Sequence, residues 1–266
     1  MIGATERLEN AVRGWLGGRP LVLGLCGAQG AGKSTVAAAL RDRLTADDVR
    51  VAILSLDDLY LGTAARDRLA RDVHPLLRTR GVPLTHDVAQ GIAVIDAIRA
   101  GHAVALPRFD KARDEPEPVE CWPMAPPAID LLIFEGWCVG ARAQSPAALV
   151  QPVNALEREQ DAGGDWRRAV NIALANEYAA LFGRIDRLVL LAAPGFEVVA
   201  RWRAEQEETL RRRLAAAARP IDGLMDDAAI TRFVAHYERL TRWILEEMPD
   251  RADLVLHLDA MRRLSE

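Results

Sequence analysis

The fold class is decided by the stretch Leu21-Val22-Leu23-Gly24-Leu25-Cys26-Gly27-Ala28-Gln29-Gly30-Ala31-Gly32-Lys33-Ser34. Its first six residues form a continuous apolar run, which is long enough for a buried parallel strand and too short for a helix. Its last eight residues match the phosphate-binding pattern G-x-x-x-x-G-K-[ST]. An Ala-rich helical pattern, Val36 to Leu44, follows. The order strand, glycine-rich loop, helix predicts a nucleotide-binding loop (P-loop) rather than an ordinary turn.

Each fixed position of this loop has a chemical reason. Glycines let the backbone turn tightly enough to aim several N–H groups at a triphosphate, and the helix adds its positive end. Lys33 reaches the β- and γ-phosphates, and the Ser34 hydroxyl is a ligand for Mg²⁺. We therefore predict that ATP and Mg²⁺ are bound through Gly27, Ala28, Gln29, Gly30, Ala31, Gly32, Lys33, Ser34 and Thr35.

Strand and helix patterns alternate along the rest of the chain. Further apolar runs lie at 51–55, 129–134, 188–192 and 254–258, and helical patterns lie at 1–16, 87–99, 166–181, 196–218 and 228–248. This alternation predicts an α/β fold of the P-loop NTPase type, a mostly parallel sheet with helices on both faces. We predict a single domain over residues 1–266, and surface loops at 107–127 and 157–165. Residues 60–127 would be an acceptor-site insertion, and 196–248 a helical lid-like region.

Composition excludes several classes of protein. The 266 residues are 50% hydrophobic and 27% charged, with a net charge of −4, so no basic surface for nucleic acid or anionic membranes is indicated. The three cysteines have no C-x-x-C spacing, which argues against disulfides and structural zinc. No apolar run approaches the ~18 residues that span a bilayer, and the first ten residues do not resemble a signal peptide. We expect a cytoplasmic protein; the oligomeric state stays open.

Two adjacent carboxylates follow the run at 51–55. Ligands of an open parallel sheet bind outside the carboxyl ends of its strands, which is where Asp57 and Asp58 would lie. Phosphoryl transfer to an alcohol requires a carboxylate that orients the hydroxyl and accepts its proton. A solvated loop or a helix cap is the alternative for these acids. We predict that Asp57 is the catalytic base.

A third carboxylate, Glu135, follows the apolar residues Leu131 to Phe134. This arrangement resembles a Walker B motif, with Glu where many P-loop proteins have Asp. A carboxylate there holds Mg²⁺ directly or through water, whereas the alternative role is to cap the next turn. We predict Ser34 and Glu135 as the metal site, and Lys33, Asp57 and Glu135 as the catalytic residues.

These motifs together resemble those of a kinase family. The P-loop, Ser55 to Tyr60 (S-x-D-D-x-Y) and Phe134 to Trp137 (F-E-G-W) resemble the phosphoribulokinase/uridine kinase/pantothenate kinase group. More narrowly, three segments resemble plant-type D-glycerate 3-kinases: Arg80 to Asp87 (R-G-V-P-L-T-H-D), Pro107 to Lys111 (P-R-F-D-K) and Trp202 to Glu207 (W-R-A-E-Q-E). The resemblance is collinear from Leu21 to the C-terminus. The sequence departs from it at 112–116, where plant-type enzymes have a Gly/Arg-rich loop.

The resemblance implies an ATP- and Mg²⁺-dependent kinase that phosphorylates a hydroxyl of D-glycerate. It supports Asp57 as the base and Glu135 as the acid at the Walker B position. The acceptor carboxylate needs a cation, for which a bidentate arginine is well suited. The predicted acceptor-site residues are Asp58, Tyr60, Arg80, Thr85, His86, Asp87, Arg108, Asp110 and Lys111.

Arginines in the helical pattern at 196–218 are candidates for a lid. Small-molecule kinases exclude water from the phosphoryl group and need cations near the triphosphate. We predict Arg201 and Arg203 for this role, and a solvated position for Arg211 to Arg213. Trp137, Trp166, Trp202 and Trp243 are predicted to serve packing.

Two alternative functions remain open from the residues alone. One is the same chemistry on another small acceptor, such as pantothenate, a nucleoside or a sugar-like molecule. The other is a P-loop ATPase or nucleotide switch that acts through a protein partner. The sequence has no N-K-x-D segment for reading guanine, and its long insertion at 60–127 is more than a switch needs. Both points favour the kinase.

Overall fold

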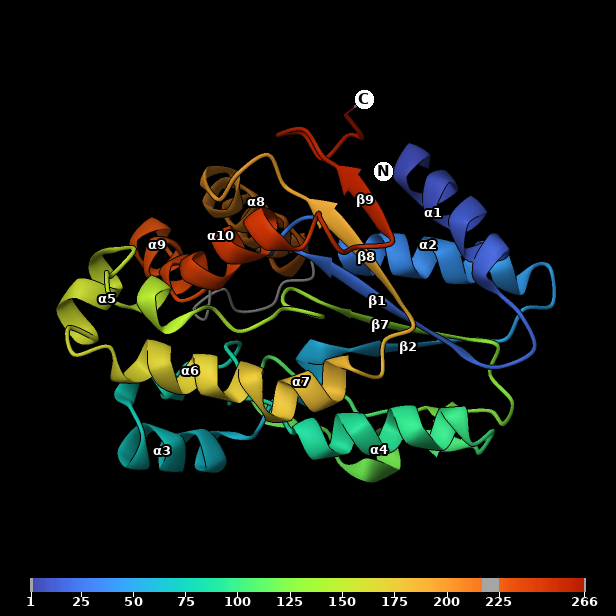
Figure 1. The fold of residues 1–266 in the computed structure, drawn as a ribbon, viewed down its shortest axis with the longest axis horizontal. Coiled ribbons are helices and arrows are strands. Elements are labelled where there is room, and N and C mark those ends of the chain that lie inside the picture. The colour runs from blue at the N-terminus through green and yellow to red at the C-terminus, as the bar shows by residue number, and fades with distance from the viewer. Residues whose placement is uncertain (1, 217–224, 266) are drawn as a thin grey trace.

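A five-stranded parallel sheet forms the centre of the computed structural model, which describes residues 2–216 and 225–265 (Figure 1). The strand order is β2-β7-β1-β8-β9. Every neighbouring pair is parallel, and the strands are β1 (Leu21–Gly27), β2 (Val51–Ser55), β7 (Leu131–Gly136), β8 (Arg187–Ala192) and β9 (Leu254–His257). This order places β1, which leads into the P-loop, between β7 and β8. The predicted α/β fold is confirmed.

Helices cover both faces of this sheet. Side chains of a strand alternate between faces, so in β1 Leu23 and Leu25 join one apolar core while Val22 and Cys26 join the other. The first core is closed by α1 (Ile2–Trp15), α2 (Lys33–Thr45) and the start of α8 (Glu197–Ala216). The second is closed by α4 (Val88–Arg99), α6 (Asp165–Ala175), α7 (Glu177–Phe182) and α10 (Glu238–Glu247).

Two predicted helices are each divided in two. The pattern at 166–181 breaks at Asn176, whose side-chain amide donates to the Ile172 carbonyl (2.8 Å). The pattern at 228–248 divides into α9 (Asp227–Ala235) and α10, where His236 Nδ1 lies 3.0 Å from the Arg232 carbonyl. In both places a side chain forms a hydrogen bond with the backbone carbonyl four residues earlier, at the point where the helix ends. Residues 217–224 of the predicted lid-like region lie outside the described residues.

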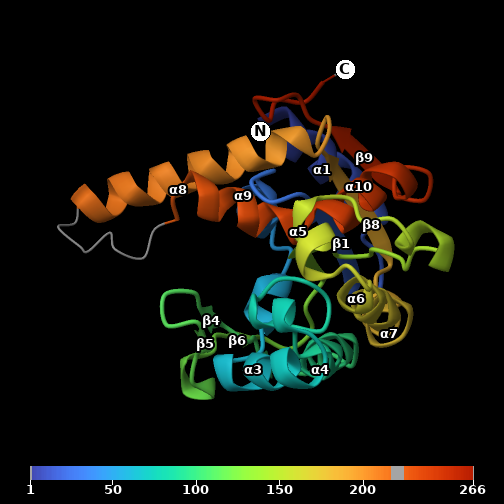
Figure 2. The ribbon, with the colours of Figure 1, turned by 90° about the vertical axis from the view of Figure 1, so that its left-hand side faces the viewer.

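The insertion at 60–127 contains more regular structure than the surface loop predicted for its second half. It holds α3 (Thr63–Asp72) and two small antiparallel pairs, and Figure 2 shows it on the opposite side of the molecule from the long helix α8. The pairs are β3 (Val104–Ala105) with β6 (Met124–Ala125), and β4 (Phe109–Asp110) with β5 (Glu115–Pro116).

Short 3-10 helices occur within the insertion and on either side of it. They are η1 (Leu56–Leu59), η2 (Pro75–Arg78), η3 (Val119–Cys121) and η4 (Pro146–Leu149).

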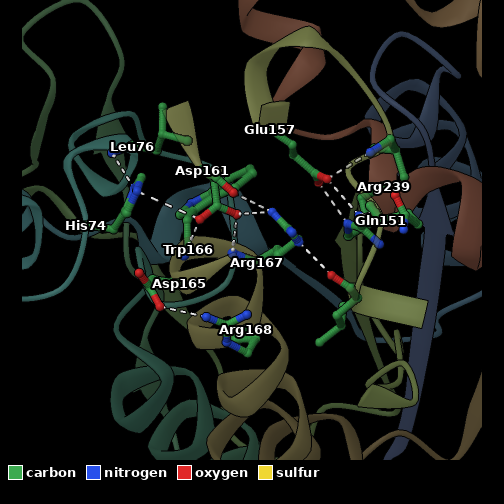
Figure 3. A network of polar contacts seen from close by, with 12 residues as sticks. His74, Leu76, Gln151, Glu157, Asp161, Asp165, Trp166, Arg167, Arg168 and Arg239 are labelled. Carbon is green, nitrogen blue, oxygen red and sulfur yellow. Dashed lines mark hydrogen bonds and ion pairs between the residues drawn. The ribbon is translucent and has the colours of Figure 1, made fainter. Parts of the chain in front are cut away.

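The predicted surface loop at 157–165 is wrong. It begins inside α5 (Ala155–Gln160), and both Glu157 and Asp161 are buried (Figure 3). Glu157 pairs with Arg239 (Oε2 to a guanidinium nitrogen, 2.7 Å), and Asp161 pairs with Arg167 (2.9 Å). Acids that look solvated in sequence are buried here because each has an arginine partner.

Two predictions about the whole chain can be compared with the described residues. Cys26, Cys121 and Cys138 are all free thiols, as their spacing predicts. Among the residues that the structure describes, no helix combines the length and apolar character that crossing a membrane requires.

Candidate active site

The P-loop joins the end of β1 to the start of α2. Gly30 and Gly32 have φ angles of +80° and +90°, a region that favours glycine. A Cβ atom at Gly30 would lie 2.6 Å from the Cβ of Trp202, so α8 packs directly on the loop. Gly32 is the N-cap of α2, and no side chain among the described residues caps that helix end. The first N–H groups of α2 are therefore available to a phosphate.

Lys33, Ser34 and Glu135 lie together at this edge of the sheet. Ser34 Oγ donates a hydrogen bond to Glu135 Oε1 (2.8 Å), and Lys33 Nζ donates to the Ala28 carbonyl (3.3 Å). Glu135 lies opposite Leu25 in the register of β7 against β1, and Glu135 is only 5% exposed. The predicted strand at 129–134 in fact runs over 131–136, so Glu135 is part of β7. A buried carboxylate beside a serine hydroxyl fits a Mg²⁺ ion, which prefers oxygen ligands.

Asp57 lies at the carboxyl end of β2, in η1. The Tyr60 hydroxyl donates to its Oδ1 (2.6 Å) and Lys111 Nζ donates to its Oδ2 (2.6 Å). Burial raises the pKa of Asp57, but the charge and hydrogen bond of Lys111 and the hydrogen bond from Tyr60 outweigh it and lower the pKa to about 2. Asp57 is therefore ionised at neutral pH, as a proton acceptor must be.

Asp58 holds the segment that carries Lys111. Its Oδ2 lies 3.3 Å from the Arg108 guanidinium and its Oδ1 accepts from the Phe109 N–H (3.2 Å). Burial raises the pKa of Asp58, against the lowering effect of Arg108. These contacts hold β4 against η1 and bring Lys111 to Asp57. The two adjacent acids therefore differ in role: Asp58 holds the segment that carries Lys111, and Asp57 binds the Lys111 ammonium.

The Arg80 guanidinium lies near the aromatic rings of Phe109 and Tyr60. Its guanidinium carbon is 5.6 Å from the centre of the Phe109 ring and 6.0 Å from that of Tyr60, and it is paired with Asp114. Asp114 also binds Arg66 (2.6 Å), which is 3% exposed. Arg66 and Asp114 were not predicted. The signal that could have found Asp114 is its place in the segment 112–116, where the sequence departs from the plant-type pattern.

Three predicted acceptor-site residues hold local turns. The buried Thr85 hydroxyl donates to the Val82 carbonyl and accepts from the Gly81 N–H. Asp87 is exposed and caps α4, and Asp110 accepts from the N–H groups that follow it and pairs with Arg113. Contact of these three with an acceptor stays a prediction.

His86 is buried beside Tyr60, with 4.9 Å between the ring centres. Its Nδ1 lies 2.6 Å from the Tyr178 hydroxyl, whose oxygen accepts from the Leu84 N–H (3.2 Å). Its Nε2 is buried and has no hydrogen-bond partner among the described residues. Burial lowers the pKa of His86 to about 3, so the ring is neutral. Tyr178 was not predicted, because it lies within an apolar helical pattern that reads as core.

The two predicted lid arginines face different segments. Arg203 pairs with Glu207 (2.7 Å) and lies 5.5 Å from the Phe233 ring of α9. Arg201 donates to the Ala260 carbonyl (2.9 Å) near the C-terminus. Arg211 and Arg212 pair with Glu208 at the surface, as predicted, and the Arg213 side chain lies outside the described part. Trp137, Trp166 and Trp202 are buried, which confirms their packing role, and Trp243 is partly buried.

Known proteins are similar to this chain in sequence and in fold. The family model "Methylmalonyl Co-A mutase-associated GTPase MeaB" matches residues 4–63, which include the P-loop. The uncharacterized kinase mug58 of Schizosaccharomyces pombe is 36% identical over 235 residues, which cover 83% of this chain and 79% of that protein. The chloroplastic D-glycerate 3-kinase of Arabidopsis thaliana is 29% identical over 229 residues, 82% of this chain and 46% of that protein. The structure of a D-glycerate 3-kinase from Cryptococcus neoformans has the same fold, with a TM-score of 0.76, 23% identity and coverage of 99% and 96%.

Proposed function

We propose that this chain, which belongs to the same kinase family as the Schizosaccharomyces pombe protein, transfers the γ-phosphoryl group of ATP to a hydroxyl of D-glycerate. One observation carries the proposal. The P-loop and the Ser34–Glu135 pair lie at the same edge of the sheet as an ionised Asp57 that is paired with Lys111. The Arabidopsis relative, which is named a D-glycerate 3-kinase, supports the choice of acceptor.

The donor side of the site is formed by backbone and by few side chains. The N–H groups at the start of α2 and the Lys33 ammonium would hold the phosphates, for which Lys33 must leave the Ala28 carbonyl. Ser34 and Glu135 would hold Mg²⁺, which neutralises phosphate charge when bound. Both roles require only groups that already face this edge of the sheet.

The acceptor side supplies the base. The Asp57 carboxylate would accept the proton of the substrate hydroxyl while the hydroxyl oxygen bonds to the γ-phosphorus. The bond between that phosphorus and the bridging oxygen of ADP breaks in the same transfer. Each Asp57 oxygen has one partner in the structure, Tyr60 or Lys111, so each keeps a lone pair for the substrate. The two partners fix the direction in which those lone pairs point.

A hydroxy acid also needs its carboxylate to be bound. Lys111, 57% exposed in its side chain, pairs with Asp57, and Arg80, 28% exposed, lies 6.0 Å from the centre of the Tyr60 ring. His86 adds a neutral donor. The Tyr178 oxygen accepts from the Leu84 N–H, and we assign its hydroxyl hydrogen to His86 Nδ1, which lies 2.6 Å away and leaves the proton of the ring on Nε2. We therefore assign His86 Nε2–H as a hydrogen-bond donor to an oxygen of the hydroxy acid.

The test is Mg²⁺-dependent release of ADP with a panel of acceptors. The panel is D-glycerate, L-glycerate, pantothenate, uridine and ribulose 5-phosphate, and Lys33→Ala is the blank. Turnover on D-glycerate alone is the expected result. Turnover on another member of the panel would keep the kinase mechanism and reject the acceptor, and the cations Arg80, Arg108 and Lys111 would then be re-examined.

A competition between ATP and GTP tests the alternative of a nucleotide switch. The match of residues 4–63 to a GTPase family makes this arm necessary, although it covers only the P-loop end of the chain. Preference for GTP with no turnover on any acceptor would reject the kinase proposal. We also propose a cytoplasmic location, which is supported by the three unpaired cysteines.

A further inference from the structure

A tight turn near the C-terminus, residues 258–265, lies against the P-loop. We call it the C-terminal turn. The Asp259 carboxylate accepts from the N–H groups of Met261 (2.8 Å) and Arg263 (2.9 Å), and Leu258 bridges to Leu264. Arg262 has a φ angle of +62°, a conformation that non-glycine residues seldom adopt. The turn therefore presents the Arg262 side chain in a fixed direction.

Arg262 contacts the P-loop and two side chains of α8 at once. Its Nε donates to the Gly30 carbonyl of the P-loop (2.6 Å). Another nitrogen of its guanidinium pairs with Glu205 of α8 (2.6 Å), and the group lies 5.1 Å from the centre of the Trp202 ring. Arg262 is not one of the predicted catalytic residues, and it lies outside the motifs named in the sequence.

The C-terminal turn is also fastened to α8 by its backbone. The Ala260 carbonyl accepts from Trp202 Nε1 (2.9 Å) and from Arg201 (2.9 Å). Trp202 in turn closes the space above Gly30, where a Cβ atom would not fit. The base of α8, the C-terminal turn and the P-loop thus form one packed unit.

The contact with Gly30 acts on one peptide unit of the P-loop. The Gly30 carbonyl and the Ala31 N–H belong to the same planar peptide. Arg262 holds the carbonyl end, and the Ala28 carbonyl accepts from the Ala31 N–H at the other end (3.1 Å). A peptide held at both ends sets the path of the loop just before Gly32, where the free N–H groups of α2 begin.

We propose that Arg262 is a positioning residue for nucleotide binding, which holds the P-loop in its phosphate-binding shape and joins it to α8. The inference rests on the proposed function only in that a nucleotide binds the P-loop. It deepens that function by adding a residue from the far end of the chain, 232 positions from Gly30.

The experiment measures binding of Mg²⁺-ADP by calorimetry without any acceptor. Loss of a hydrogen bond from a charged donor predicts that Arg262→Ala weakens binding about tenfold or more. Glu205→Gln removes the ion pairs that a half-exposed acid makes with Arg262 and Arg201, so we expect a change of about twofold to threefold. Arg262→Lys keeps a charged donor and should recover part of the loss. Arg263→Ala, in the same turn but paired only with Asp259 at the surface, is the matched control and should bind like the wild type.

Kinetics and unfolding separate positioning from general damage. We expect Arg262→Ala to raise the KM for ATP while the KM for the acceptor changes less than twofold, and circular dichroism to show a folded protein. Wild-type affinity in Arg262→Ala, an equal loss in Arg263→Ala, or an equal rise in both KM values would overturn the inference and leave the proposed function intact. Absence of nucleotide binding by the wild-type protein would overturn both. If Arg262→Ala does not fold, Glu205→Gln and Arg262→Lys decide the question by the same criteria.

Discussion

The two halves of the candidate site are built in different ways. The donor half consists of nine consecutive residues, 27–35, and one neighbour, Glu135 on the adjacent strand. The acceptor half brings together η1, residues 80–87 and residues 107–117, and its side chains are paired with one another: Asp57 with Lys111, Asp58 with Arg108, and Arg80 with Asp114. The donor half depends on backbone shape, whereas the acceptor half depends on contacts between side chains.

This difference has a consequence for mutagenesis. In the donor half the phosphates would be held largely by backbone N–H groups, so removal of one side chain should affect its own ligand and little else. In the acceptor half the three ion pairs Asp57–Lys111, Asp58–Arg108 and Arg80–Asp114 balance charge, so the effects of substitutions within them should be strongly non-additive. The following predictions test that contrast, in order of decreasing effect.

The largest effect is expected for Asp57→Asn. Removal of a general base costs typically 10²-fold to 10⁴-fold in rate, and we expect a loss of about 10³ in kcat. Affinity for ATP should change by less than about threefold, because Asp57 lies in the acceptor half. Steady-state kinetics with both substrates varied would check this. Asp165→Asn, which alters an exposed acid at the start of α6, is the control; an equal loss of kcat and ATP affinity in Asp57→Asn would contradict the assignment.

Glu135→Gln should act on the metal alone. The buried carboxylate pairs with Ser34, and its loss should raise the Mg²⁺ concentration for half-maximal activity about 10-fold to 100-fold. Ser34→Ala should change the same quantity in the same direction. The measurement is a Mg²⁺ titration at fixed ATP, with Glu120→Gln, an exposed acid, as the charge-matched control. A change in the KM for the acceptor instead would break the division between the two halves.

The acceptor half should also make stability depend on pH. Burial lowers the pKa of His86 to about 3, below the ordinary value of 6.5, so the unfolded chain binds a proton that the folded chain does not. Stability from this group is therefore complete above pH 6.5 and is lost as the pH falls toward 3. Between pH 7 and pH 5 the loss amounts to about 2 kcal/mol. Urea unfolding measures the free energy of unfolding at both pH values. From pH 7 to pH 5 this free energy should fall by about 2 kcal/mol less in His86→Gln than in the wild type. A variant of the exposed His102 should show the same fall as the wild type.

The smallest effect is expected for Tyr178→Phe. This change removes the hydroxyl that bonds to His86 Nδ1, worth about 1 kcal/mol, so the KM for the acceptor should rise about fivefold while the KM for ATP stays constant. Positioning through His86 can be distinguished from a packing defect by the double variant. Tyr178→Phe should have no further effect on the acceptor KM in a His86→Gln background. Additive effects would show that Tyr178 does not act through His86.

Prediction from sequence agreed with the structure where an element consists of consecutive residues. The loop between β1 and α2 and the acid near the end of β7 lie where the local pattern placed them, because backbone conformation and strand order follow from local pattern. The outcome was poorer where a polar residue is satisfied by a distant partner. Glu157 was predicted to be exposed, yet it is buried against Arg239, which lies 82 positions away. Arg201 donates to the C-terminal turn, a contact the sequence did not indicate, and its lid role stays a prediction.

The sequence by itself determined the parallel sheet, the place of the P-loop within it and the acids at its carboxyl edge, because the period of apolar residues and the needs of tight turns are local properties. Only the tertiary structure decided which charges are paired. It brought Lys111 to Asp57, Tyr178 to His86 and Arg262 to Gly30, across 54, 92 and 232 positions of the chain. Such contacts leave no periodic signal, since each partner acquires its role only when packing brings the two together.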